Sequence, residues 1–254
     1  MMNKKIEIYV ENVSKHFKKI TALDDVSMQF VNGNLYGVIG PAGAGKTTLF
    51  RIMLDLMRAN SGRIVYRKDG NDIGYKQIQE DIAYMPQSQS LYADLSVSEH
   101  LDFFRKLYGI NDADFEKKKQ ELIRLARLGD FLDRPAGKLS GGMYKKLGLI
   151  CALLRSPQIM LLDEPTNGVD PISRRQFWDL LHNAVESGIL VLMSTAYMDE
   201  AERCSGVVLM EQGRVLATGN PEEMLKRYKV NNFDDLFLMR ARGVRHEKNN
   251  RKGK

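Results

Sequence analysis

The sequence predicts an α/β fold in which helices cover both faces of a sheet, with an antiparallel β subdomain and a helical subdomain attached to it. Strand patterns alternate with helix patterns in the first and last parts of the chain, whereas the middle carries helix patterns almost alone. The 254 residues allow one large domain or two small ones, and a hydrophobic fraction of 43% is ordinary for a folded protein. Because no internal repeat or low-complexity linker interrupts the chain, we expect one compact unit.

The first part of the chain carries strand signals. Residues 6–13 and 26–30 alternate apolar and polar residues, as half-buried strands do. Residues 35–39 predict a short apolar strand that leads into a glycine-rich turn, and residues 45–57 predict the helix that follows. A polar, glycine-containing region at residues 67–75 separates this helix from the next strand. We expect the alternating strands of this region to supply the antiparallel subdomain.

Helix patterns dominate the middle of the chain. A strand at residues 82–85 is followed by helices at residues 97–108, 114–128 and 142–154. These patterns predict an inserted helical subdomain at about residues 88–157.

Strand and helix signals alternate again in the last part of the chain. A strand at residues 158–162 precedes a helix at 171–186, a strand at 189–194 and a helix beginning near Met198. This return to alternation continues the central sheet.

A hairpin and one helix complete the predicted fold. Residues 206–210 and 214–217 are strand-like and flank the segment Glu-Gln-Gly at residues 211–213, which suits a hairpin turn. Pro221 opens a last helix, because proline is tolerated in a first helical turn.

The formal net charge of +6 is concentrated at the C-terminal end. Residues 240–254 hold seven Lys or Arg against one acidic residue, and the rest of the chain holds equal numbers of basic and acidic residues. We therefore expect residues 1–239 to form the folded domain and residues 240–254 to form a basic, disordered tail. Contact of this tail with lipid or with a partner subunit is the alternative. A body without net charge gives no indication of a nucleic-acid partner.

The sequence shows neither a targeting signal nor a membrane span. Its first ten residues contain lysines but run directly into strand-like sequence, without the apolar core and cleavage site of a signal peptide. No run approaches the roughly 20 apolar residues that a membrane span needs. Cys151 and Cys204 lack metal-ligand spacing, so we expect buried thiols and a reducing compartment. If the protein serves a membrane process, other chains supply the membrane part.

A phosphate-binding loop follows the predicted strand at residues 35–39. Two glycines separated by four residues precede Lys-Thr, between a strand and a helix, as this motif requires. The glycines let backbone N–H groups converge on phosphate oxygens, and the helix N-terminus adds further donors. Lys46 supplies positive charge to the β and γ phosphates of a nucleotide, and Thr47 offers its hydroxyl to Mg²⁺. The predicted nucleotide-binding residues of this loop are Gly40, Pro41, Ala42, Gly43, Ala44, Gly45, Lys46, Thr47 and Thr48.

Two carboxylates end the predicted strand at residues 158–162. Asp163 and Glu164 follow an apolar run, where a Mg²⁺-associated acid and a water-orienting acid are needed for phosphoryl transfer. We assign Asp163 to the metal and Glu164 to the attacking water. Solvation of a turn is the alternative role for two such acids, but their combination with a phosphate loop favours catalysis.

A second anion-binding motif separates this sequence from other phosphate-loop proteins such as kinases, GTPases and helicases. Ser140, Gly141 and Gly142 begin the predicted helix at residues 142–154, and a serine hydroxyl with two glycine amides at a helix N-terminus suits an anion. Together with Leu139 and Met143 they resemble the ABC signature, commonly LSGGQ, with Met143 in place of glutamine. The motif lies about twenty residues before the carboxylates, which makes the resemblance specific.

From about residue 6 to residue 239 the sequence resembles the ABC ATPases. The resemblance implies a P-loop NTPase cassette with a RecA-like core, an antiparallel β subdomain and an inserted helical subdomain. It also implies that Phe17 stacks on adenine and that Asp170 belongs to the loop that contacts a second cassette. Gln87 resembles the glutamine that joins the core to the helical subdomain, senses the γ-phosphate and binds Mg²⁺.

The implied cofactors are ATP and Mg²⁺, with Glu164, Gln87 and Lys46 as catalytic residues. In this family two cassettes enclose two ATP molecules, and each site combines the phosphate loop of one subunit with the signature of the other. Ser140 is therefore expected to serve a partner's nucleotide. The implied partners are a second ABC ATPase subunit, in a hetero- or homodimer, and integral membrane permease subunits. These partners place the protein peripherally at the cytoplasmic face of a membrane.

One position departs from the family pattern. Most ABC ATPases carry a histidine that contacts the γ-phosphate after the strand at residues 189–194, and here Ala196 occupies its place. Losing one donor to transition-state charge costs on the order of 3 kcal/mol, about a hundredfold in rate. We expect slow hydrolysis at this subunit's own site.

Ala196, the segment at residues 171–175 and the run at residues 197–202 together resemble the first cassette of bacterial tandem ATPases that drive type 2 ABC exporters, including multidrug-efflux systems. We therefore expect an exporter subunit in asymmetric pairing with another ATPase chain. Two alternatives stay open: a regulatory subunit that clamps ATP, which Ala196 favours, and a soluble ABC ATPase of translation or DNA repair. The transported substrate is not encoded here, because in this family its path lies in the membrane chains.

Overall fold

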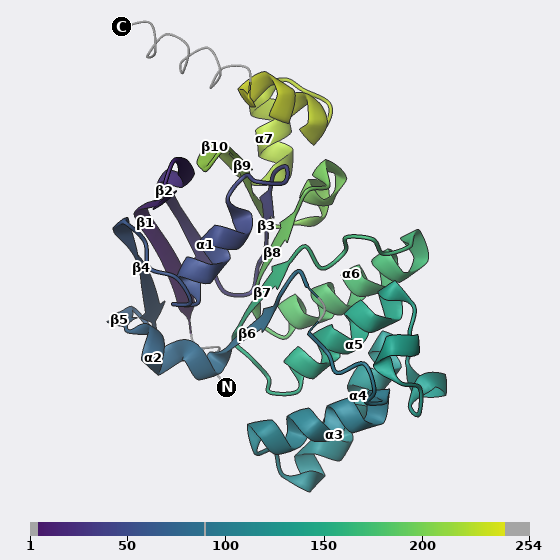
Figure 1. Cartoon of the computed structure of the whole chain (residues 1–254). Coiled ribbons are helices and arrows are strands. Elements are labelled where there is room, and N and C mark those ends of the chain that lie inside the picture. Colours follow the sequence, from purple (N-terminus) through teal and green to yellow (C-terminus); the bar gives the residue numbers. More distant parts are fainter. Residues whose placement is uncertain (1–4, 89, 242–254) are drawn as a thin grey trace, which may run out of the picture.

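Two β-sheets and the helices between and beside them make up the computed structural model, which describes residues 5–88 and 90–241 (Figure 1). One sheet is antiparallel with strand order β2-β1-β4-β5, and the other has the order β10-β9-β3-β8-β7-β6. This architecture confirms the predicted α/β fold with an antiparallel part and a helical part. Most of the predicted basic tail, residues 242–254, lies outside the described residues.

The antiparallel sheet forms the left side of the molecule in Figure 1. It consists of β1 (Ile6–Phe17), β2 (Ile20–Val31), β4 (Ser61–Lys68) and β5 (Asn71–Ile73). β1 and β2 extend further toward their shared turn than alternation predicted. The last four residues of β1 have no fully buried side chain, so hydrophobic periodicity could not reveal them.

The hairpin of β4 and β5 was not predicted from the sequence. Tyr66 is the one fully buried residue of β4, so this strand shows no regular alternation of buried apolar and exposed polar side chains. The turn between the two strands is Asp69-Gly70, with φ values of 52° and 83°. An Asp-Gly pair is a strong signal for a two-residue hairpin, and it lay within the region assigned as polar loop.

The central sheet carries parallel strands with one antiparallel edge. β6, β7, β8, β3 and β9 pair in parallel, and β10 pairs antiparallel with β9. Its strands are β3 (Leu35–Ile39), β6 (Ile82–Met85), β7 (Ile159–Asp163), β8 (Leu190–Thr195), β9 (Gly206–Glu211) and β10 (Arg214–Gly219). The β9–β10 hairpin confirms the predicted turn, in which Gln212 and Gly213 both have positive φ.

The helices lie on both sides of this sheet, and α1 lies between the two sheets. They are α1 (Lys46–Met53), α2 (Tyr75–Ile78), α3 (Val97–Tyr108), α4 (Asp112–Ala126), α5 (Gly141–Leu153), α6 (Pro171–Glu186) and α7 (Pro221–Tyr228). α1 ends four residues earlier than predicted, because Asp55 takes a left-handed conformation with φ 53°. The helix predicted near Met198 is a short 3-10 helix, η4 (Met198–Arg203). Residues 233–241 form a further helical segment, which crosses residue 240, the predicted start of the tail.

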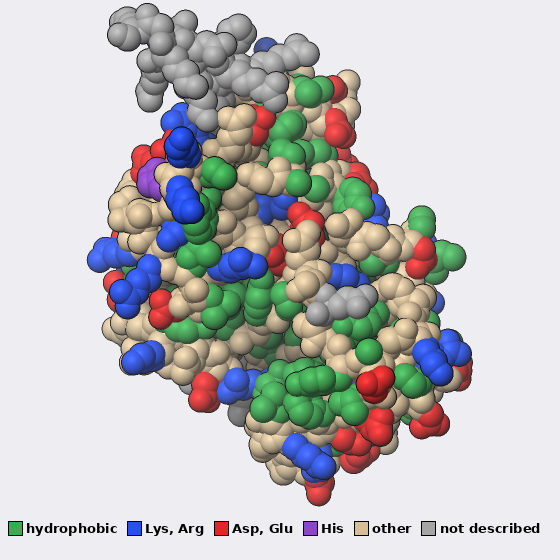
Figure 2. Space-filling view, in the orientation of Figure 1, with side chains coloured by type: hydrophobic (Ala, Val, Ile, Leu, Met, Phe, Trp, Pro, Cys, Tyr) green, Lys and Arg blue, Asp and Glu red, His purple; other side chains and the backbone are tan. Residues whose placement is uncertain are grey.

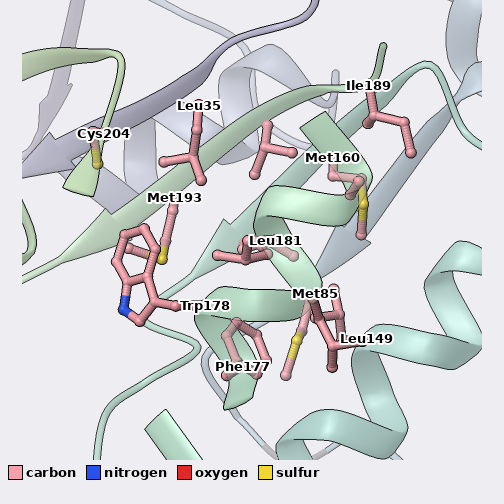
Figure 3. Packing of buried hydrophobic residues seen from close by; sticks show 14 of the residues in the cluster. Leu35, Met85, Leu149, Met160, Phe177, Trp178, Leu181, Ile189, Met193 and Cys204 are labelled. Atoms are coloured by element: carbon pink, nitrogen blue, oxygen red, sulfur yellow. The ribbon is translucent and has the colours of Figure 1, made fainter. Parts of the chain in front are cut away.

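Buried apolar side chains pack against each face of the central sheet. Figure 3 shows the cluster between the sheet and α5 and α6, where Phe177 and Trp178 pack beside Met85, Leu149 and Met193. Both aromatic residues are therefore part of the buried core. Burial of one such side chain contributes about 1.5–3 kcal/mol, so this cluster fixes α5 and α6 against the strands.

Two further sequence predictions can be compared with the structure. Cys151 and Cys204 are both buried, as predicted. Over the described ranges, no helix combines the length and the apolar character that crossing a membrane requires.

Candidate functional site

The carboxyl ends of three neighbouring strands meet at one edge of the central sheet. The phosphate loop follows β3, Asp163 ends β7, and Thr195 ends β8, with β3 and β7 both paired to β8. The Gly40 N–H donates to the Thr195 carbonyl at 3.1 Å, which joins the start of the loop to the end of β8. Ligands of open α/β sheets bind at such strand ends.

The phosphate loop depends on its last glycine, Gly45. Gly45 has a φ of 104° and precedes α1, and a Cβ atom there would lie 2.4 Å from the Ala22 carbonyl oxygen. Only glycine permits both the conformation and this close approach. Thr47 and Thr48 follow in the first turn of α1, where both are half-buried.

Lys46 folds back over this loop. Its ammonium donates to the carbonyls of Gly40 at 2.7 Å and Pro41 at 3.1 Å, and its side chain is only 4% exposed. The cation is therefore held where a phosphate group between loop and helix would meet it.

The three predicted catalytic residues lie together. The Lys46 ammonium lies 3.1 Å from Glu164 Oε1, and the Gln87 side-chain amide donates to Glu164 Oε2 at 2.8 Å. Glu164 itself has a φ of 46°, a strained conformation for a residue with a side chain, and such outliers occur at functional sites. Each carboxylate oxygen of Glu164 thus has a partner from a different loop.

Asp163 is completely buried beside Glu164. Its Oδ1 accepts a hydrogen bond from the Ser194 hydroxyl at 2.5 Å, and within the described residues its Oδ2 has no partner. The Ser194 hydroxyl also accepts from the Glu164 N–H at 3.0 Å. Ser194 therefore orients the Asp163 carboxylate and holds the backbone of Glu164, a role that no sequence pattern indicated.

An unpartnered buried carboxylate oxygen fits a cation or one of its water ligands. No cluster of three or more His, Cys, Asp and Glu side chains that could hold a metal ion occurs within residues 5–88 and 90–241. A Mg²⁺ ion bound here would need oxygens from the nucleotide and from water, which is how Mg²⁺ usually binds. The surroundings of Asp163 fit such an ion.

The signature residues lie at the N-terminus of α5, in a second group of residues. Ser140 caps α5 by accepting from the Met143 N–H at 3.3 Å, and the neighbours of the two glycines are in the segment from Gly168 to Ser173. Asp170 caps α6 by accepting from the Ser173 N–H at 2.9 Å. This hydrogen bond is the largest of the contributions that lower the pKa of the Asp170 carboxyl. The structure brings the signature against the predicted dimer-contact loop.

The predicted adenine-binding residue lies at the end of β1. The Phe17 ring is 42% exposed, and the Lys15 ammonium lies 5.2 Å from its centroid. An exposed aromatic ring is available for stacking with a planar base.

Ala196 is exposed directly after β8, and no described histidine takes its place. His16 is an exposed residue of β1, His100 bonds the Tyr92 N–H and the Ser96 carbonyl, and His182 packs against Trp178. His246 lies outside the described residues. The segment after Ala196 is fixed by Glu200, which is buried and pairs with Arg174, Thr166 and Trp178.

Two residues of α5 contact the glutamine loop, which we define as residues 86–91 with residue 89 outside the described ranges. The Lys145 ammonium donates to the Gln87 carbonyl at 3.3 Å, and the Tyr144 hydroxyl accepts from the Leu91 N–H at 2.8 Å. Neither contact was predicted from the sequence. Tyr144 and Lys145 directly follow the signature in the sequence, but this position does not indicate in which direction either side chain points.

Comparison with known proteins agrees with this geometry. The sequence model of the family described as "ABC transporter" matches residues 23–167. The chain is 41% identical over 207 residues to the "Probable multidrug ABC transporter ATP-binding protein YbhF" of Escherichia coli, which covers 79% of this chain and 35% of that protein. It is 32% identical over 219 residues to the "Nod factor export ATP-binding protein I" of Cupriavidus metallidurans, covering 86% of this chain and 72% of that protein.

A solved structure has the same fold. The "Structure of ATP binding subunit of ABC transporter" superposes with a TM-score of 0.80 at 28% identity and covers 92% of this chain and 99% of that chain. The family match, the relatives and this fold agree with the phosphate loop, the paired carboxylates and the signature. This chain belongs to the ATP-binding cassettes of the ABC transporter family, whose members are ATPases coupled to transport.

Proposed function

We propose that this chain is the ATP-binding and ATP-hydrolysing subunit of an ABC exporter, and that Glu164 orients the attacking water. The contact of both Lys46 and Gln87 with the Glu164 carboxylate is the observation that carries the proposal. When ATP binds, the Lys46 ammonium would turn from Glu164 to the β and γ phosphates. The released carboxylate oxygen of Glu164 could then accept a hydrogen bond from water.

The nucleotide would lie between Phe17 and the phosphate loop. The exposed Phe17 ring would stack on adenine, and backbone N–H groups of residues 40–48 would bind phosphate oxygens. Asp163 and the Thr47 hydroxyl would hold Mg²⁺, and Gln87 would offer its amide oxygen while its amide nitrogen donates to Glu164. The ion would neutralise charge that develops between the β and γ phosphates.

Hydrolysis at this site would be slow because a donor to the γ-phosphate is missing. Ala196 stands at the position of the family's histidine, and a methyl group cannot donate a hydrogen bond. One such donor contributes about a hundredfold in rate. A second cassette that keeps the histidine would make the pair asymmetric, with this chain as the slower site.

Membrane subunits would dock on the helical subdomain. Figure 2 shows hydrophobic side chains gathered on the lower part of the molecule, where Figure 1 places α3. Tyr92, Phe103 and Leu107 are exposed there, and the rings of Tyr92 and Phe103 lie 5.3 Å apart. An exposed apolar patch of this kind suits a protein partner. The cassette would then sit peripherally at the cytoplasmic face of a membrane.

The names of the relatives favour export as the direction of transport. The E. coli protein is described as a probable multidrug ABC transporter ATP-binding protein and the C. metallidurans protein as a Nod factor export ATP-binding protein. This chain spans only about a third of the E. coli protein, so export remains part of the proposal.

A regulatory subunit that clamps ATP without hydrolysing it is the second candidate function, and Ala196 favours it. Single-turnover hydrolysis of Mg-ATP by the unaltered chain and by Glu164→Gln separates the two. A motor hydrolyses ATP slowly, and Glu164→Gln abolishes hydrolysis while ATP stays bound. Bound ATP that neither protein hydrolyses would indicate the clamp instead.

The connection with a membrane needs its own measurement. The chain is purified from its native cells twice, once with detergent extraction of the membranes and once without. An exporter subunit should co-purify with membrane proteins from the detergent extract. Recovery in the soluble fraction alone would contradict the exporter and favour the soluble ABC ATPase.

A further inference from the structure

Lys145 lies one turn into α5, and its ammonium faces the glutamine loop. It is half-buried and donates to the Gln87 backbone carbonyl at 3.3 Å. We propose that Lys145 is a positioning residue, which holds the glutamine loop so that the Gln87 side chain reaches Glu164. The proposal rests on the proposed catalytic role of Glu164.

The contacts form a continuous chain from α5 to the phosphate loop. Lys145 holds the Gln87 main chain, the Gln87 amide donates to Glu164 Oε2 at 2.8 Å, and Glu164 Oε1 lies 3.1 Å from Lys46. Lys46 in turn donates to the Gly40 carbonyl. A displacement of Gln87 would therefore be felt at the catalytic carboxylate and at the cation beside it.

The preceding residue of α5 fastens the other end of the glutamine loop. The Tyr144 hydroxyl accepts from the Leu91 N–H at 2.8 Å and donates to the Leu91 carbonyl at 3.4 Å. Consecutive side chains of one helix thus hold Gln87 and Leu91. Since Gln87 itself is exposed, these tethers rather than burial limit its movement.

The charges around Lys145 favour an ammonium group beside the glutamine loop. Burial lowers the pKa of the Lys145 ammonium, and the attraction of the Asp163 and Glu164 carboxylates opposes that shift. The cation therefore lies within reach of the electrostatic field of both acids. Replacing it by an apolar side chain removes the tether and this favourable interaction together.

Single-turnover kinetics of Lys145→Met test the positioning role. We expect the hydrolysis rate to fall about fivefold, the factor that one net hydrogen bond of about 1 kcal/mol represents, with the dissociation constant for ATP unchanged. Lys145→Arg, which keeps a cationic donor, should restore the rate to within about twofold. The matched control is Lys118→Met on α4, because Lys118 is also half-buried and donates to one side-chain oxygen, that of Ser156. It should leave the rate unchanged.

The same substitution in a Gln87→Ala background shows whether Lys145 acts through Gln87. We expect Lys145→Met to cause no further loss there, because the contact that it positions is already absent. A further fivefold loss in the Gln87→Ala background would overturn the proposal. A hydrolysis rate of Lys145→Met equal to that of the unaltered chain would overturn it as well.

The Gln87 side-chain amide resonance tests the tether without any need for hydrolysis, because this amide donates to Glu164 Oε2. In the nucleotide-free protein, Lys145→Met should move this nuclear magnetic resonance signal toward that of a solvent-exposed amide, whereas Lys118→Met should not. An unchanged Gln87 resonance would overturn the tether even if Glu164 is catalytic. Absence of hydrolysis by the unaltered chain, with a shifted Gln87 resonance in Lys145→Met, would refute only the proposed catalytic function.

Discussion

Among the hydroxyl groups at the strand ends, we predict that removing that of Ser194 lowers the free energy of unfolding most. Its side chain is fully buried, donates to Asp163 Oδ1 at 2.5 Å and accepts from the Glu164 N–H at 3.0 Å. In Ser194→Ala the Glu164 N–H keeps the Ser194 carbonyl at 3.1 Å, so that donor stays satisfied. The Asp163 carboxylate, however, loses the hydrogen bond to Oδ1 while its Oδ2 already lacks a partner among the described residues.

The expected loss follows from the charge of that acceptor. A hydrogen bond to a charged group is worth about 1.5–3 kcal/mol, so we expect Ser194→Ala to lower the free energy of unfolding of the nucleotide-free protein by about 2 kcal/mol. Urea denaturation followed by circular dichroism measures the difference. The control is Ser187→Ala, because the exposed Ser187 hydroxyl donates to the Asn183 carbonyl on its own helix, and its loss should stay within about 0.5 kcal/mol. Equal losses in the two variants would refute the role assigned to Ser194.

Three further predictions concern packing, thiols and acid stability. Gly142→Ala should lower the free energy of unfolding by about 1–3 kcal/mol, because its Cβ would overlap a side chain of α6 at 2.2 Å. Gly148→Ala on the same helix should be neutral or stabilising by up to about 1 kcal/mol, since its nearest neighbour lies at 3.4 Å; equal losses would contradict this packing. Burial raises the pKa of the Cys151 and Cys204 thiols, so a thiol reagent at pH 8 should modify them only after unfolding, and rapid labelling of the native protein would be the opposite result. Because amide hydrogen bonds lower the folded-state pKa of Asp170, its contribution to stability should be complete above about pH 4 and be lost as pH falls through that pKa. Nuclear magnetic resonance titration should give a midpoint below about 3.9, and a midpoint at or above that value would contradict the helix cap.

The elements that sequence patterns predicted well are those with buried faces. The strand at residues 35–39 was predicted at its observed bounds because most of its residues are buried. The distal part of β1 and the β4–β5 hairpin carry few buried side chains, so their pairing leaves no periodic trace. The end of α1 depends on the backbone conformation of Asp55, which no apolar pattern reports.

The site was predictable where one motif holds its residues together. The phosphate loop is a local segment whose glycines are required by conformation and close approach, so its position follows from spacing. The contacts of Glu164 with Lys46 and Gln87 join three separate segments, and only the folded sheet brings them within hydrogen-bonding distance. Ser194 remained unassigned because a serine at the end of a buried strand has no distinctive spacing from Asp163.

Ala196→His tests most directly whether this site binds ATP but hydrolyses it slowly for lack of a γ-phosphate donor. Single-turnover hydrolysis of saturating Mg-ATP should become about a hundredfold faster in Ala196→His, with little change in ATP affinity. Ala196→Phe, which adds bulk without a donor, should not accelerate the reaction. Equal rates in the unaltered chain and in Ala196→His would contradict the proposed cause of slow turnover.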